Sequence, residues 1–598
     1  MSHIQVFMDN QSSATSNSKL DWWRDARFGL FIHWGLYSIP AGTWKDERIL
    51  GIAEQIMRFA KIPNSEYTKL ASKFNPEKFD ADEWVKTARD AGMKYICFTA
   101  KHHDGFAMYK SDVSEYNIVD ATSYKHDPIA ELSQACKKYG LKLCLYYSHR
   151  QDWHDPHAGM MEWENQYDLT PERGEVDFAH YMKTKALPQV EEILRKYHPV
   201  DLIWYDTPFD ITPEHAQIFY DHVKSINPDC IVNSRVGCGF GDYGTLGDNQ
   251  MPARIMPGDW EMVGTMNRTW GYKSWDNEWK SSDELILALI ESVSKGCNYM
   301  LNIGPDAQGS IPADSILRLK IVGEWLWRNG EAIYNCKPSP FIDAHEWGYT
   351  TQKANTLYLH VHKQNISHID MNGIRNKVTS VSLLHDSSHV LAFDDSHNSI
   401  DDQHRLVIQL PEYISDVPAS VIKVSFENEL DIAESIEQDL SGNIFLPTYK
   451  SSCIKDNQYT QTFTEPSGEA ASLNPESGSL VWKFKVNKPG SFIVQFKTNR
   501  HWRQDFPQGH NVKITCAEQT LNSELLQHKE LRDITLHSYP TSISEVGKIK
   551  IDSVGTHEIL VSATKLGTAQ RHTITDEFLT DSLNTIRLMR LELIYCNN

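Results

Sequence analysis

Apolar and polar positions alternate along the first half of the chain with the periods of helices and buried strands. Amphipathic stretches predict a helix over 82–91 and another over 128–139. Each stretch ends at a glycine, Gly92 and Gly140, the residue type suited to the left-handed position after a helix. The pattern therefore predicts well-delimited helices with short connections to the next strands.

Short apolar runs predict buried strands over 94–99, 141–147, 202–205, 231–233 and 299–303. Before the last strand, Ser281 and Glu284 have the spacing of a capping box that opens a helix with one apolar face. Strands that alternate with helices indicate a parallel sheet, and this many in one domain favour a (β/α)8-type barrel. A doubly wound sheet is the alternative, but the sequence has no glycine-rich phosphate loop to support it.

Strand-like alternation dominates after the Pro338–Pro340 segment and indicates all-β structure. Predicted strands cover 356–361, 405–410, 421–426, 480–486, 491–496 and 586–593. We predict a disordered N-terminal tail over 1–20, a barrel over 21–338, a β-sandwich over 339–427 and a second β-sandwich over 428–598.

Charge and composition exclude several classes of partner. The formal net charge of -20 argues against binding of nucleic acid or of an anionic membrane surface. No apolar run is long enough to span a membrane, and the N-terminal 20 residues do not resemble a secretory signal. We expect a cytoplasmic protein as the sequence stands, and a periplasmic or secreted one if a signal has been removed. The ten cysteines form neither a disulfide framework nor a zinc motif.

Polar residues whose side chains could take part in catalysis or binding directly follow the predicted strands. They are Lys101-His102-His103-Asp104, Ser148-His149, Asp206 and Ser234-Arg235. In a (β/α)8 barrel, the carboxyl ends of the strands form the active-site face. The 17 tryptophans and 25 tyrosines also fit a carbohydrate site, although most such rings fill the core of a protein.

Two carboxylates are candidates for glycosidic bond hydrolysis, which needs one group to attack the anomeric carbon and one to protonate the leaving oxygen. Asp206 follows the strand over 202–205, where it either acts as a nucleophile or caps the next helix. Glu261 lies between Trp260 and Met262, which would raise its pKa as a general acid requires, or it is a solvated loop carboxylate.

The histidines raise a rival hypothesis, a metal-dependent hydrolase. The sequence has no HExxH motif, and adjacent His102 and His103 on an extended segment would point in opposite directions. Hydrogen bonds to sugar hydroxyls are the simpler use of these side chains. We therefore expect no metal and no cofactor.

Four separated motifs resemble the α-L-fucosidases of glycoside hydrolase family 29. They are Trp22–Gly35, Lys101–Phe106, Trp204–Asp206 and Asn298–Pro305, in the family's order, and the resemblance covers roughly residues 20 to 335. It implies a catalytic barrel followed by a β-sandwich, and a retaining exo-enzyme acting on a fucosylated oligosaccharide or glycoconjugate. The second β-sandwich, over 428–598, is a candidate carbohydrate-binding domain.

The resemblance also implies roles for individual residues. Asp206 takes the position of the nucleophile and Glu261 that of the acid/base. The residues that match fucose-binding positions are His33, Glu54, His102, His103, Tyr146, Trp204 and Arg235. One departure is Gln55, which stands where the family often has a tryptophan after the glutamate.

The sequence thus predicts an exo-glycosidase that releases terminal α-L-fucose by double displacement. The alternatives are a related exo-glycosidase acting on a sugar of the same shape, such as α-L-galactose, and a carbohydrate-binding protein that has lost activity.

Overall fold

A computed structural model of the 598-residue chain describes residues 18–158, 176–252, 255, 258–341, 345–398, 403–411, 417–432, 436–439, 441–456, 458–461, 471–500, 505–531, 540–568 and 585–596. The predicted tail over 1–20 lies outside this range except for residues 18–20, which form a short 3₁₀ helix. The chain divides into two compact units, Met1–Asp248 with Pro257–Pro338 and Asn249–Met256 with Ser339–Asn598. The predicted domain limits stay a prediction.

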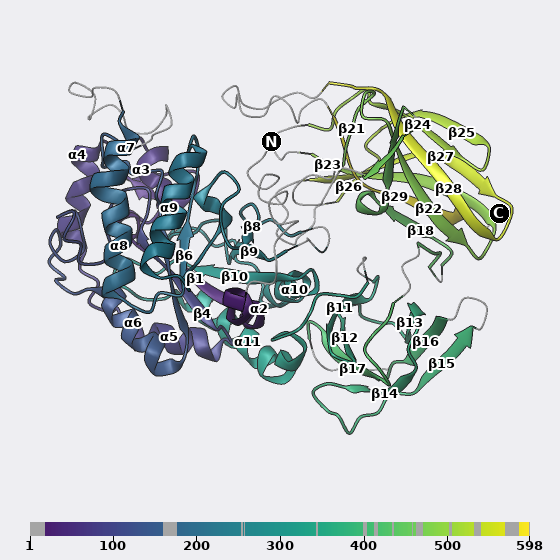
Figure 1. Cartoon of the computed structure of the whole chain (residues 1–598), viewed down its shortest axis with the longest axis horizontal. Coiled ribbons are helices and arrows are strands. Elements are labelled where there is room, and N and C mark those ends of the chain that lie inside the picture. Colours follow the sequence, from purple (N-terminus) through teal and green to yellow (C-terminus); the bar gives the residue numbers. More distant parts are fainter. Residues whose placement is uncertain are drawn as a thin grey trace. The chain divides into compact units, whose positions relative to one another are not determined.

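The first unit contains an eight-stranded parallel sheet in the order β7-β6-β5-β4-β1-β10-β9-β8 (Figure 1). Its strands are β1 (Phe28–Ile32), β4 (Tyr95–Lys101), β5 (Lys142–Tyr147), β6 (Leu202–Tyr205), β7 (Ile231–Val232), β8 (Gly244–Thr245), β9 (Trp260–Thr265) and β10 (Cys297–Ile303). A parallel bridge between Asn233 and Tyr243 joins the two edges, and the Ser234 amide donates to the Tyr243 carbonyl at 2.9 Å. The sheet therefore closes, and the predicted (β/α)8-type barrel is confirmed.

The helices lie outside these strands in Figure 1. They are α2 (Asp21–Ala26), α3 (Ile56–Phe59), α4 (Asn64–Tyr67), α5 (Ala81–Asp90), α6 (Pro128–Tyr139), α7 (Phe178–Tyr181), α8 (Leu187–Lys196), α9 (Pro213–Ile226), α10 (Ser282–Ser294) and α11 (Ala313–Asn329). The local signals act as predicted: Gly140 is left-handed after α6, and Ser281 and Glu284 form the capping box of α10. A two-stranded hairpin, β2 (Thr43–Trp44) and β3 (Glu47–Arg48), follows β1.

The interior of the barrel is filled by large side chains from alternate strand positions. Phe31, Tyr95, Tyr146 and Trp204 are buried and belong to one hydrophobic cluster. Such a barrel is a packed core and not a pore, so open space for a ligand exists only beyond the strand ends.

The second unit is all-β, as the alternation after residue 338 predicts. One sheet has β11 (Gly348–Lys353), β12 (Thr356–Val361), β17 (Ser420–Phe426) and β14 (Val378–Leu383), and another has β13 (His368–Ile374), β16 (Gln403–Gln409) and β15 (Phe393–Asn398). One hydrophobic core draws side chains from both of these sheets, the arrangement of a β-sandwich.

Two further sheets share a second, larger core. The first holds β18 (Ile444–Pro447), β29 (Ile586–Cys596), β23 (Gly490–Asn499), β27 (Thr541–Ile551) and β26 (Lys529–Leu531), with β21 (Ala471–Leu473) paired to β29. The second holds β20 (Gln458–Gln461), β19 (Ser452–Lys455), β22 (Ser479–Val486), β28 (Gly555–Lys565), β24 (Asn511–Cys516) and β25 (Gln519–Glu524). The second unit therefore contains two sandwich-like cores.

Candidate active site

Asp206 lies directly after β6, at the carboxyl end of the barrel strands. Its side chain is 12% exposed and bonds to two neighbours: Tyr146 donates to Oδ2 at 2.9 Å, and Arg235 Nη1 donates to Oδ1 at 2.9 Å. Burial is the largest single effect and raises the pKa of Asp206, but the charge and hydrogen bond of Arg235, the nearby His103 and the hydrogen bond from Tyr146 together outweigh burial, and the pKa lies below its ordinary value. Asp206 is therefore a nearly buried carboxylate that stays ionised, as a nucleophile must.

Three histidines gather beside Asp206. His33 Nδ1 lies 2.7 Å from Asn302 Oδ1, and His103 Nδ1 lies 2.7 Å from Ser148 Oγ. His103 Nε2 is 3.7 Å from Asp206 Oδ2. Burial lowers the pKa of His33 and of His103 to about 4, so both rings are neutral near pH 7.

His102 corrects one expectation. An extended segment would turn His102 and His103 in opposite directions, but their ring centroids are only 4.2 Å apart. The strand ends at Lys101, and the Gly105 amide donates to the His102 carbonyl in a turn. The chain thus leaves the strand geometry at the point where the two histidines begin, and both rings lie on the site's side.

Arg235 and Trp204 form one stacked unit. The guanidinium lies over the Trp204 ring, 4.7 Å from its centroid, and Tyr146 stacks on Trp204 with centroids 5.6 Å apart at 18°. The indole nitrogen of Trp204 donates into the barrel, to Glu261 Oε2 at 2.9 Å. Trp204 therefore directs its indole N–H into the barrel and leaves its apolar ring as a surface at the base of the site.

Asp248 is a carboxylate that the sequence patterns did not single out. It lies in the loop after β8, its side chain is 50% exposed, and Arg235 Nη2 donates to its Oδ1 at 2.6 Å. Arg235 therefore holds Asp206 and Asp248 with the two amino groups of one guanidinium. Two carboxylates that share one planar cation lie close together, one nearly buried and one open to solvent.

Glu261 does not lie in this pair, which corrects its expected role as acid/base. It is the second residue of β9, and Thr265 at the carboxyl end is roughly 13 Å farther along the strand. Its side chain is fully buried, and both oxygens accept hydrogen bonds from the barrel interior: Oε1 from Tyr95, and Oε2 from Trp204 and Tyr243. Burial raises the pKa of Glu261 to about 6, but no leaving group can reach it.

Glu54 is buried beside Trp270, whose ring contacts His33. Its Oε2 accepts from the amides of Trp270 and Gly271 at 3.2 and 2.9 Å, whereas the buried Oε1 has no hydrogen-bond partner among the described residues. Burial raises the pKa of Glu54 to about 7.

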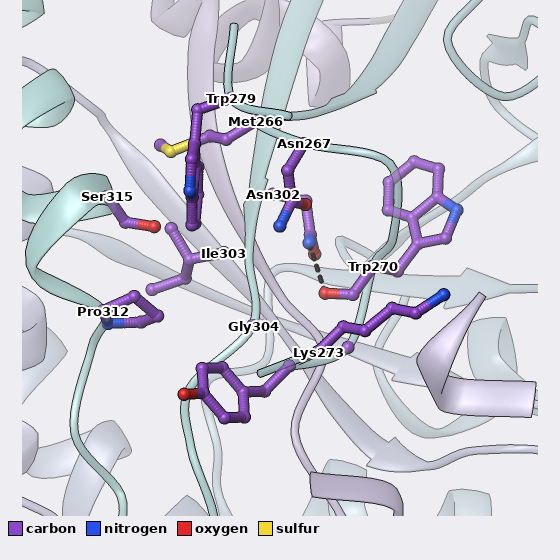
Figure 2. A pocket seen from close by; sticks show the side chains of 12 residues that line it. Met266, Asn267, Trp270, Lys273, Trp279, Asn302, Ile303, Gly304, Pro312 and Ser315 are labelled. Carbon is purple, nitrogen blue, oxygen red and sulfur yellow. Dashed lines mark hydrogen bonds between the residues drawn. The ribbon is translucent and has the colours of Figure 1, made fainter. Parts of the chain in front are cut away.

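Trp270 supplies an aromatic ring where Gln55 cannot. Its ring centroid lies 5.2 Å from that of His33, and Gln55 is instead bonded to Arg58. Figure 2 shows Trp270 on the wall of a small pocket, with its backbone carbonyl accepting from the Asn302 amide at 2.7 Å. The other lining residues are Met266, Asn267, Gly271, Tyr272, Lys273, Trp279, Ile303, Gly304, Pro312 and Ser315.

The structure thus brings together His33, Glu54, His102, His103, Tyr146, Trp204, Asp206 and Arg235. Glu261 touches this group through the Trp204 indole, from the barrel interior. Sequence reasoning missed Asp248, Trp270 and Asn302 as parts of the site, and it placed Ser148 at a strand end without giving it a role. Asn302 stands inside the quoted motif Asn298–Pro305, so its signal was present. Asp248 follows Gly247 in a loop and has no local signal.

No group of three or more His, Cys, Asp or Glu side chains within the described ranges has an arrangement that could hold a metal ion. In the same part of the chain, no helix combines the length and apolar character of a membrane span.

Comparisons with known proteins identify the family. Residues 2–331 match the family model described as alpha-L-fucosidase. The chain is 31% identical to the tissue alpha-L-fucosidase of Mus musculus over 374 residues, covering 59% of this chain and 77% of the relative. It is 29% identical to the tissue alpha-L-fucosidase of Homo sapiens over 437 residues, covering 68% and 87%.

Solved structures extend the similarity to the β-rich part. The alpha-L-fucosidase from Vibrio sp. strain EJY3 superposes with a TM-score of 0.83 at 31% identity, covering 98% of this chain and 99% of that one. AlfC from Lactobacillus casei, in complex with alpha-L-fucose product, matches with a TM-score of 0.50 at 38% identity, covering 53% of this chain and all of its own. The chain therefore belongs to the alpha-L-fucosidase family, glycoside hydrolase family 29.

Proposed function

We propose that this chain releases terminal α-L-fucose from fucosylated oligosaccharides or glycoconjugates with net retention at the anomeric carbon. The observation that carries the proposal is the pair Asp206 and Asp248 on one guanidinium, that of Arg235. Retaining glycosidases place their two carboxyl groups about 5 to 5.5 Å apart, close enough for one to attack and the other to protonate.

Asp206 acts as the nucleophile in this mechanism. Its carboxylate bonds to the anomeric carbon while the bond from that carbon to the leaving oxygen breaks, and protonated Asp248 gives its proton to that oxygen. Asp248 then takes a proton from water, the water oxygen bonds to the anomeric carbon, and the bond to Asp206 breaks. Fucose leaves with the configuration it had in the substrate.

The remaining site residues hold the sugar. His33, His102 and His103 offer ring nitrogens, and Glu54 offers its free oxygen. Trp270 offers an apolar face of the kind that sugar rings contact. Together these groups offer contacts to a single sugar, as an enzyme that removes terminal residues requires.

The experiment is hydrolysis of an aryl α-L-fucoside by wild type and by Asp206→Gly, followed by NMR of the first-formed sugar. We expect the α-anomer first, loss of nearly all turnover in the variant, and partial recovery when azide is added to the variant. First formation of the β-anomer would rule out double displacement. An aryl α-L-galactoside run in parallel tests the related sugar, and absence of turnover on both would identify an inactive binding protein.

A further inference from the structure

We infer that Ser148 and Asn302 fix the tautomers of His103 and His33, so that both rings carry their hydrogen on Nδ1 and accept sugar hydroxyls at Nε2. This inference rests on the proposed function for the identity of the sugar. It assigns positioning roles to Ser148 and Asn302 and a direction to each hydrogen bond with the substrate.

The hydroxyl of Ser148 decides the tautomer of His103. Ser148 Oγ lies 2.9 Å from the Gln151 carbonyl and 2.7 Å from His103 Nδ1. A carbonyl oxygen only accepts, so the single hydroxyl hydrogen points to Gln151. Ser148 Oγ must then accept from the ring, which places the hydrogen of His103 on Nδ1.

The amide of Asn302 decides the tautomer of His33 in the same way. Asn302 Nδ2 donates to the Trp270 carbonyl at 2.7 Å, and the opposite orientation would set two acceptors against each other (Figure 2). The amide oxygen therefore faces His33 Nδ1 at 2.7 Å and can only accept from it. Two unrelated backbone carbonyls thus impose the same tautomer on two rings.

Each ring has only one hydrogen to place, because burial lowers the pKa of His33 and His103 to about 4 and both rings are neutral near pH 7. With Nδ1 protonated, Nε2 carries a lone pair. His103 Nε2 lies 3.7 Å from Asp206 Oδ2, and neither atom can donate to the other. A hydroxyl hydrogen of the substrate is the missing partner at this position.

The neighbour of His103 identifies the hydroxyl. Asp206 attacks the anomeric carbon, so a group beside Asp206 faces the hydroxyl on the adjacent carbon, the 2-hydroxyl. Hydrogen bonds to this hydroxyl strengthen in the transition state of glycoside hydrolysis. His103 is therefore expected to require a 2-substituent that donates, and to discriminate against 2-deoxy and 2-O-methyl sugars.

Neutron diffraction of the exchanged wild-type protein near pH 7 tests the assignment directly. We expect deuterium on Nδ1 of both His33 and His103 and none on Nε2. Deuterium on Nε2 of either ring would overturn the assignment. This measurement involves no substrate, so it stands whether or not the proposed fucosidase activity is found.

Kinetics of Ser148→Ala test the positioning role. We expect kcat/KM for an aryl α-L-fucoside to fall about tenfold to hundredfold, and kcat/KM for its 2-deoxy analogue to change less than about threefold. Ser292→Ala is the matched control, because Ser292 is equally buried and bonds to the Ala288 carbonyl within α10, outside the site. It should leave both substrates unaffected.

Equal losses on both substrates, or no loss on either, would show that Ser148 does not act through the 2-hydroxyl. If Ser148→Ala does not fold, the neutron map of the wild type still shows which nitrogen of His103 carries the hydrogen. If wild type turns over neither substrate, the proposed function fails, and the same map still judges the tautomers.

Discussion

At the scale of single residues, Asp206 and Glu261 show how neighbours assign different roles to two buried carboxylates. Asp206 has a cation, Arg235, at 2.9 Å and remains ionised at the open end of the barrel. Glu261 has only neutral donors, two tyrosine hydroxyls and an indole, and burial raises its pKa to about 6. The surroundings of Asp206 suit a nucleophile, and those of Glu261 suit a structural group that holds Trp204 in place.

Substitutions of Asp248 and Glu261 should differ in how their effect on hydrolysis depends on the leaving group. Acid catalysis matters most when the leaving group is poor, so Asp248→Asn should slow hydrolysis of a natural fucosyl disaccharide about 100- to 10,000-fold and an activated aryl fucoside far less. Glu261→Gln keeps an acceptor for Trp204 and should lose a similar, small factor on both substrates. Measured kcat/KM values for the two substrates decide. A leaving-group dependence that appears in Glu261→Gln and not in Asp248→Asn would restore Glu261 as the acid.

We expect burial of ionised Glu54 to lower the free energy of unfolding. Its pKa rises from 4.5 to about 7 on folding, so between these pH values the folded protein binds more protons than the unfolded chain. The free energy of unfolding therefore falls as pH rises from about 4.5 to 7, by about 3 kcal/mol from this group. Glu54→Gln should remove that fall, and so be more stable than wild type at pH 8 and equal to it near pH 4.5.

Denaturant unfolding of wild type and Glu54→Gln at both pH values measures the difference. The same variant should lose activity, because Glu54 Oε1 no longer accepts from the sugar. A variant that is less stable than wild type at pH 8 would show that ionised Glu54 contributes favourably to the fold.

The residues missed by the sequence patterns share a physical reason. Asp248 and Trp270 lie in loops without periodicity, and their places are fixed by contacts to Arg235 and Glu54, which are distant in sequence. The strand-end residues, by contrast, could be predicted, because parallel strands bring their carboxyl ends together wherever the fold is a barrel. His103 and Asp206 are of this kind.

At the scale of elements, β9 explains the misplacement of Glu261. Its sequence, Trp260–Thr265, carries a charged residue and a glycine inside a fully buried strand, so it lacks the continuous apolar run that marked the five predicted barrel strands. A carboxylate inside a barrel and one in a loop look alike in sequence. The difference lies in Tyr95 and Trp204, contributed by other strands.

Gly29 of β1 leaves the space that this interior network needs. It is in register with Tyr95 of β4, and a Cβ at Gly29 would lie 2.3 Å from the Tyr95 ring. Gly29→Ala should lower the free energy of unfolding by about 1–3 kcal/mol through overpacking. It should also lower kcat, because Tyr95 would move from Glu261 and loosen the support of Trp204.

Gly140→Ala is the control for this prediction. Gly140 has φ +75°, so alanine there is strained, but its Cβ would meet no atom within 4 Å and it ends α6 outside the barrel. Both variants should be destabilised in denaturant melts, and only Gly29→Ala should lose turnover per folded molecule. Full activity in Gly29→Ala would show that displacement of Tyr95 does not affect the active site.

At the scale of the whole molecule, the described residues form separate hydrophobic cores in the barrel and in the two β-rich sections. The change from helical to strand periodicity near residue 338 predicts only the boundary between the barrel and the β-rich part. The order of the strands in each sheet could not be predicted, because strands distant in sequence, such as β18 and β29, are neighbours. Separate cores are expected to unfold as separate cooperative units.

Calorimetry with and without L-fucose tests both this division and the place of the site. A thermal scan of the full chain should resolve more than one transition. A ligand that binds only the folded barrel stabilises it by about 2.7 kcal/mol at a concentration of 100 Kd, and leaves units that do not bind it unchanged. L-fucose should therefore raise the midpoint of the transition with which activity is lost, and D-fucose should shift none. A single transition would show that the cores unfold as one unit. A shift of a second transition would identify a further fucose site in the β-rich part, the expected property of a carbohydrate-binding domain over 428–598.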